Sequence, residues 1–224
     1  MQLQLNEDLR LKIEPYFQLL FDVPVLAGTS FSFINLKNDW FISDRLVNDG
    51  EGQNYRMDLT LERFLSKGYY YLLSGSLFKS RYKGGDGVWR STAYDRGYVF
   101  NALIGKEWMT GGRKSNIFGL NGRITYQGGT RFIPVDEPAS IASCEIIEDP
   151  TRAYSNQLDG NMIIHFSASF RKNKPNHSSL WTLSILNATM VKEFEGFDYN
   201  RQTQKIDQIG EPLIIPNLSY KIEF

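Results

Sequence analysis

Apolar and polar residues alternate along most of the chain. The clearest case is Asn161–Arg171, where apolar side chains occupy the even positions from Met162 to Phe170 and polar side chains occupy most of the odd ones. A period of two places alternate side chains on opposite faces of an extended strand. The sequence therefore predicts eight strands, over residues 9–21, 55–64, 69–81, 98–108, 118–127, 161–171, 181–185 and 217–224. The expected fold class is all-β, with antiparallel strands in up-and-down order.

Two features near the N-terminus refine this prediction. Residues Gln2–Leu5 also alternate and are followed by polar residues Asn6–Asp8. They predict the tail of a preceding strand and a turn. Pro15 lies among the apolar positions of the first long strand. Because proline cannot donate a hydrogen bond to a neighbouring strand, it predicts a local bulge at that point.

Short and long connections alternate between the predicted strands. Short links lie near positions 66, 111 and 174, and long links cover residues 23–54, 83–96, 129–159 and 190–213. The two kinds of link should therefore lie at opposite ends of the sheet. This arrangement is typical of outer-membrane β-barrels, which have tight periplasmic turns and long extracellular loops.

Two further features indicate that the apolar side chains face lipid. Aromatic residues gather near predicted strand ends, as lipid-interface girdles do: Tyr69, Trp108, Tyr126, Trp181 and Tyr220. The polar positions carry charges of opposite sign, for example Arg56 with Asp58 and Glu62, or Lys221 with Glu223. A polar interior with an apolar exterior characterises a transmembrane barrel. Two alternatives stay open, namely a soluble sandwich or lipocalin-like barrel that binds a small ligand, and a free-standing eight-stranded outer-membrane barrel with a structural role.

Composition narrows the function classes. Lys plus Arg and Asp plus Glu each total 25, so the formal net charge is zero and a nucleic-acid partner is not expected. No stretch contains the roughly 20 apolar residues that a membrane helix requires. The N-terminal residues lack the basic start and apolar segment of a secretory signal. We therefore expect residues 1–224 to be part of a longer outer-membrane protein, without its signal peptide or plug.

Several segments closely resemble TonB-dependent outer-membrane receptors, in the branch that carries an N-terminal carboxypeptidase-regulatory-like domain. They are LKIEPYFQLLFDVP (11–24), DLTLERFLSKGYYYLLSG (58–75), DGVWRS (86–91) and GLNGRITYQGG (119–129). The closing PNLSYKIEF (216–224) is similar to the terminal strand that barrel assembly machinery recognises. Within it, Leu218, Tyr220, Ile222 and Phe224 form the apolar positions of that assembly strand.

The resemblance implies a 22-stranded barrel that is plugged by an N-terminal domain and embedded in the lipid of a bacterial outer membrane. It implies import of a scarce nutrient, such as a siderophore or a glycan, driven through TonB and the proton gradient of the inner membrane. The chain departs from this pattern because its sequence lacks the plug and the TonB-contacting segment and predicts fewer than half of the strands. Contact with TonB would run through a plug that this chain does not contain.

The candidate chemistry is sparse, and we expect neither an enzyme nor a bound cofactor or metal. His165 and His177 lack partners for catalysis, and Cys144 has no second cysteine. An acidic group could hold calcium, but its spacing matches no compact calcium loop: Glu145, Glu148, Asp149 and Asp159. Three asparagines fit Asn-x-Ser/Thr without functional meaning in a bacterial protein: Asn176, Asn187 and Asn217.

Ligand contact is expected from ring-bearing and guanidinium side chains of the long links, because these give specific binding area. The candidates are Trp89, Arg90, Tyr94, Arg96, Arg131 and Arg152. Arg131 also opens the segment RFIPVD (131–136), which looks like a motif near a barrel mouth.

Overall fold

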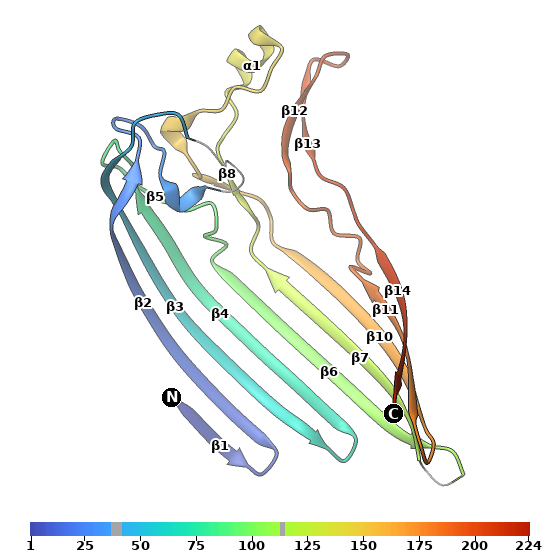
Figure 1. The fold of residues 1–224 in the computed structure, drawn as a ribbon. Coiled ribbons are helices and arrows are strands. Elements are labelled where there is room, and N and C mark those ends of the chain that lie inside the picture. Colours follow the sequence, from blue (N-terminus) through green and yellow to red (C-terminus); the bar gives the residue numbers. More distant parts are fainter. Residues whose placement is uncertain (37–41, 113–114) are drawn as a thin grey trace.

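A computed structural model describes residues 1–36, 42–112 and 115–224. The molecule is built on one antiparallel ten-stranded sheet, which confirms the all-β fold class (Figure 1). Its strands are β1 (Gln2–Asn6), β2 (Leu9–Val25), β3 (Val47–Ser66), β4 (Tyr69–Lys83), β5 (Trp89–Ser91), β6 (Tyr98–Thr110), β7 (Asn116–Gln127), β10 (Asn161–Asn173), β11 (Ser178–Leu186) and β14 (Ile215–Glu223).

Neighbours in the sheet follow one another in sequence, so the topology is up-and-down. The order is β1-β2-β3-β4-β6-β7-β10-β11-β14, and the short β5 pairs with the end of β4. Figure 1 shows a curved sheet with β1 and β2 at one edge and β14 at the other. Among the described residues, no strand pairing joins these two edges.

The two ends of the sheet differ as the sequence predicts. Tight links at one end join β1 to β2, β3 to β4, β6 to β7 and β10 to β11. The link between β3 and β4 has Lys67 and Gly68 at φ 53° and 79°, the left-handed pair that suits a two-residue hairpin turn. The long loops gather at the opposite end, as Figure 1 shows. Residues 37–41 of the first loop, and Arg113 and Lys114 of one predicted turn, lie outside the described residues.

All eight predicted strands are present, and the predicted N-terminal tail pairs with β2 as β1. The bulge predicted at Pro15 is wrong, because Pro15 pairs in register with Met57 and the register shifts come later, between Leu20 and Val25. Ile13 donates its backbone N–H to Met1 O on the β1 side. The nitrogen of Pro15, two residues further along β2, lies on that same side, where β1 no longer runs beside β2. The proline therefore removes no hydrogen bond between strands.

The two faces of the sheet differ in character and in exposure. On β10 the most exposed apolar side chains are Met162, Phe166 and Phe170, at 47%, 44% and 38%. The same apolar face continues onto the neighbouring strands, because Phe170 lies opposite Phe118 on β7 and Trp181 on β11. Other exposed apolar side chains on this face are Phe17, Tyr55, Met57, Leu77, Phe100, Ile104, Ile124, Leu183 and Leu218.

The buried hydrophobic residues lie at the long-loop end rather than at the centre of the sheet. Among the described residues these are Val25, Tyr82, Ala93, Ala153 and Tyr199. The long loops also contain elements that alternation does not predict, namely η1 (Phe33–Asn35), β8 (Arg131–Phe132), α1 (Glu137–Ser143), η2 (Pro150–Arg152), β9 (Asn156–Gln157), β12 (Gly196–Asn200) and β13 (Lys205–Ile209). None of the helices in the described part of the chain has the length and apolar character needed to span a membrane.

Candidate ligand site among the long loops

The polar face of the sheet is joined by hydrogen bonds between strands. Asn54 Nδ2 donates to Gln18 Oε1 at 2.9 Å, and Ser80 Oγ donates to Asn54 Oδ1 at 2.7 Å, which links β2, β3 and β4. Thr125 Oγ1 donates to Asn101 Oδ1 at 2.7 Å between β7 and β6. Many polar groups of this face therefore find hydrogen-bond partners on neighbouring strands.

Ion pairs on the same face confirm most of the predicted charge pattern. Arg56 Nε lies 2.6 Å from Asp58 Oδ1, and Lys221 Nζ lies 2.7 Å from Glu223 Oε1. Glu62, which the sequence places on the same polar face, forms its ion pair with Arg10. The strand register explains this, since Arg10 is directly opposite Glu62.

A buried carboxylate ties two of the long loops to the sheet. Asp95 is fully buried, and its Oδ1 accepts a hydrogen bond from the backbone N–H of Ser80 at 3.2 Å. Lys79 Nζ and Arg131 Nε lie 3.2 and 3.4 Å from Asp95 Oδ2. Arg131 also donates to Asp95 O at 2.8 Å and to Tyr154 O at 3.3 Å. Arg131, a predicted ligand contact, is therefore engaged in holding the loops together.

Arg90 is engaged in a similar way. Its two terminal nitrogens donate to the two carboxylate oxygens of Asp86 at 2.9 and 2.6 Å, and Nη2 also donates to Thr151 O at 3.1 Å. The hydrogen-bonded Arg90 guanidinium holds the pKa of the Asp86 carboxyl below its ordinary value. The pair therefore fastens the loop before β5 to the segment at η2.

The other predicted contacts lie around the same loops. The guanidinium of Arg81 lies 5.7 Å from the Trp89 ring centre, and Tyr94 is exposed while its hydroxyl donates to Leu36 O at 3.1 Å. Arg96 donates weakly to Gly128 O at 3.4 Å. Arg152 is exposed on η2. The structure brings these residues to one end of the molecule, and their contact with a ligand stays a prediction.

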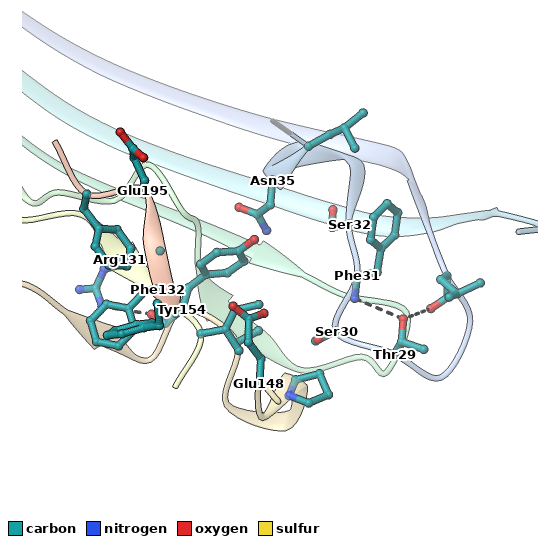
Figure 2. Close-up of a pocket in the computed structure, with 18 residues that line it drawn as sticks. Thr29, Ser30, Phe31, Ser32, Asn35, Arg131, Phe132, Glu148, Tyr154 and Glu195 are labelled. Atoms are coloured by element: carbon teal, nitrogen blue, oxygen red, sulfur yellow. Dashed lines mark hydrogen bonds between the residues drawn. The ribbon is translucent and has the colours of Figure 1, made fainter. Parts of the chain in front are cut away.

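A cavity of about 510 Å³ lies between three of the long loops. Figure 2 shows Phe31, Ser32 and Asn35 from the first loop on one side of it, with Arg131 and Phe132 on the other. Phe132, Phe194 and Phe197 form a cluster of rings whose centres are 5.1 to 5.7 Å apart. Glu148 and Glu195 also line the cavity. Of its 18 lining residues, five are aromatic and seven are polar or charged.

A second and wider cavity of about 800 Å³ opens beside it, under the β12–β13 hairpin. Its charged and polar lining includes Arg96, Asp159 and His165. Asn187 is also in the lining. Its Nδ2 donates to Val191 O at 2.9 Å and to Leu213 O at 3.0 Å, and its Oδ1 accepts the backbone N–H of Val191 at 3.0 Å. Asn187 therefore shapes the start of the last long loop.

The residues considered for metal or catalytic chemistry are scattered. Within residues 1–36, 42–112 and 115–224, no group of three or more His, Cys, Asp and Glu side chains could hold a metal ion. Asp149, from the acidic group, caps η2 by accepting from the backbone N–H of Thr151 at 3.0 Å. His165 Nδ1 accepts from Asn187 N at 3.3 Å, and the His177 ring lies 6.4 Å from that of Phe224. Cys144 is exposed at the end of α1.

Sequence reasoning missed the residues that form the cavity. Asn35 and Tyr154 stand in loops without periodicity, so no pattern distinguishes them from other loop residues. The ring cluster had a faint signal, because FEGF places Phe194 and Phe197 close together in a polar stretch. Comparison of the chain with protein-family models, with curated proteins and with solved structures finds no match in any of the three.

Proposed function

We propose that the chain is the C-terminal barrel segment of a TonB-dependent outer-membrane receptor that imports a scarce nutrient. The observation that carries the proposal is the continuous exposed apolar face of the sheet, backed by a hydrogen-bonded polar face. If about ten half-exposed large apolar side chains each cost about 1 kcal/mol in water, the total is on the order of 10 kcal/mol. That is comparable with the whole stability of a typical domain. Contact with hydrocarbon removes this cost.

The aromatic residues on that face support a lipid environment. At the tight-turn end, the rings of Trp181 and Tyr220 are 4.2 Å apart, and Trp108 stacks with Phe118 at 5.7 Å. Tyr98 and Tyr126 lie 5.3 Å apart at the other end of their strands. Two aromatic bands separated by aliphatic residues are typical of a barrel between its two membrane interfaces. In this proposal the tight turns face the periplasm and the long loops face outward.

The two sheet edges support a segment of a larger barrel. Within the described residues, β1 covers β2 only as far as Ile13, and β14 pairs with β11 alone. Unpaired backbone groups are not tolerated in hydrocarbon, so both edges require further strands in the membrane. We propose that these strands, and the plug that would contact TonB, belong to the rest of the receptor.

The last strand supplies the proposed signal for barrel assembly. Leu218, Tyr220 and Ile222 occupy alternate positions of β14 on the apolar face, and together with Phe224, just after the strand, they are 42% to 102% exposed. A free edge of this kind offers both apolar side chains and unpaired backbone to an assembly partner. The proposed partners of the chain are therefore membrane lipid, the assembly machinery and the imported nutrient.

The proposal is tested in the native bacterium by fractionation and uptake. The protein is expected in the outer-membrane fraction. Deleting its gene should abolish uptake of one member of a labelled panel of ferric siderophores, cobalamin, peptides and oligosaccharides, and a protonophore should abolish the same uptake. Recovery in the soluble fraction would overturn the membrane assignment. Membrane recovery with every uptake unchanged would overturn the transport assignment alone.

A further inference from the structure

We propose that Arg63 and Lys106 hold the phosphate of an anionic phospholipid against the apolar face of the sheet, near the tight turns shown in Figure 1. The inference rests on the proposed function, because it requires this face to contact lipid. It is carried by the position of the two cations, by their unused hydrogen-bond donors and by the sign of the charges around them.

Both cations lie on the apolar face, on either side of β4. Arg63 on β3 pairs with Tyr71 on β4, and Lys106 on β6 pairs with Tyr69 on β4. Ile104, two residues before Lys106, lies opposite Tyr71 and is exposed on the same face. Two strand spacings of about 4.8 Å and two residue steps of about 3.4 Å separate the Cα atoms of the two cations by roughly 12 Å. Side chains of this length can therefore reach one phosphate from both sides.

Arg63 has hydrogen-bond donors that no protein group satisfies. Within the described part of the chain, its guanidinium makes no hydrogen bond and no ion pair, and its buried Nε has no partner. An unpaired guanidinium on a lipid-facing surface is costly. The paired oxygens of a phosphate match the planar donor geometry of arginine, so a phospholipid head group would satisfy these donors.

Lys106 is held at the level of the aromatic band. Its Nζ donates to Tyr69 OH at 2.6 Å and lies 4.4 and 5.0 Å from the ring centres of Tyr69 and Trp108. An ammonium carries three N–H donors, so this hydrogen bond leaves others available to a ligand. Interfacial aromatic rings lie at head-group depth in a bilayer, and a lysine stem lets its charged end reach the same depth. Lys106 is thus positioned for a lipid phosphate.

The charges on this part of the apolar face have one sign. Among the described strand positions between the middle of the sheet and the tight turns, the apolar face carries Arg63, Lys106 and Lys172, and no Asp or Glu. The nearby Glu62 lies on the polar face and pairs with Arg10. Such a surface attracts an anionic head group. A zwitterionic lipid has the same phosphate but also a cation, so it should bind more weakly.

The test measures which lipids lie beside Trp108, in a protein whose Trp40, Trp89 and Trp181 are changed to Phe. The full chain is reconstituted into phosphatidylcholine vesicles with increasing fractions of phosphatidylglycerol brominated near the head of one acyl chain, because bromine quenches nearby tryptophan fluorescence. Phosphatidylglycerol should bind beside Trp108 at least threefold more strongly than phosphatidylcholine. Equal quenching by brominated forms of the two lipids would overturn the proposal and leave the membrane assignment intact. Absence of quenching by either lipid would overturn the membrane assignment itself.

Matched variants assign the preference to the two cations. Arg63→Gln and Lys106→Gln should each at least halve the preference for phosphatidylglycerol, and the double variant should reduce the ratio to about one. Arg63→Lys keeps the charge and should retain most of the preference. Lys12→Gln removes a positive charge from the polar face of β2 and should leave the ratio unchanged. A preference that survives in the double variant, or that falls equally in Lys12→Gln, would exclude Arg63 and Lys106 as the site.

Discussion

The Asp95 carboxylate and the Arg131 guanidinium form a buried contact that joins two loops far apart in sequence. Asp95 Oδ2 lies 3.4 Å from Arg131 Nε, and the same nitrogen donates to Asp95 O at 2.8 Å. Asp95 is fully buried, whereas the Arg131 side chain is 15% exposed. Because Arg131 also binds Tyr154 O, the contact sets the position of one wall of the loop cavity.

Asp95→Asn should loosen the long loops without unfolding the sheet. The change leaves the largely buried guanidinium of Arg131 without its counter-charge, which costs about 3 kcal/mol. Hydrogen exchange should rise at the backbone amides of residues 92–96 and 130–157, and stay unchanged in β10. Asp49→Asn, at an exposed position of β3, is the matched control and should have no effect. Unchanged exchange in the Asp95 variant would contradict this role.

Strand positions could be predicted from the sequence because side chains on a two-sided sheet must alternate. The pattern located all eight long strands, although it placed the end of β2 four residues early and the start of β3 eight residues late, at Phe21 and Tyr55. The missed start, Val47–Asn54, is mostly polar on both parities. A strand that extends beyond an apolar environment needs no apolar face, so periodicity gives no signal there.

The sequence indicated the long-loop end, where the cavities lie, but not the residues that line them. Long loops indicated where binding groups would gather; Tyr94 and Arg152 are exposed there, and their contact with a ligand stays a prediction. The loops themselves are held by side chains such as Asp95 and Asn35, whose partners are up to 58 residues away. Contacts of that kind follow from the fold, so a single sequence does not reveal them.

Gly85→Ala should detach the first long loop from the loop that follows β4. An added Cβ would lie 2.0 Å from Leu26 O, a backbone atom that a rotamer change cannot move aside. Gly85 O also accepts the backbone N–H of Gly28 at 3.0 Å. The expected loss is about 1–3 kcal/mol of loop stability, as for other overpacked sites. Limited proteolysis within residues 26–36 should accelerate, whereas Gly112→Ala, which has open space around its Cβ, should not change it.

The Asp86–Arg90 pair should make loop stability depend on pH in the acid range. Because the folded-state pKa of Asp86 is lowered from 3.8, its stabilising contribution is present above that value and is lost as pH falls through the lower folded pKa. Asp86→Asn should therefore cost about 1 kcal/mol at pH 6 and less at pH 2. Thermal melts of the two proteins at both pH values measure this. A difference that is the same at both pH values would contradict the assignment, and Asp198→Asn, exposed on β12, is the control.

A charge placed on the apolar face should oppose membrane insertion. Phe166→Lys would bring an ammonium toward the middle of the bilayer, at a cost of roughly 2 to 4 kcal/mol. Ser167→Lys, one residue further along β10, places the same charge on the polar face and should cost much less. The yield of folded protein in lipid vesicles across a urea series measures both. Equal losses in the two variants would contradict the proposed orientation.

The most direct test of the account is the chemical accessibility of the two faces of β7. In a Cys144→Ser background, Ile124→Cys places a thiol on the apolar face and Thr125→Cys places one on the polar face. With the protein in lipid vesicles, a membrane-impermeant charged maleimide should label the Thr125→Cys protein and leave the Ile124→Cys protein unlabelled. Rapid labelling of the Ile124→Cys protein with protection of the Thr125→Cys protein would contradict the account.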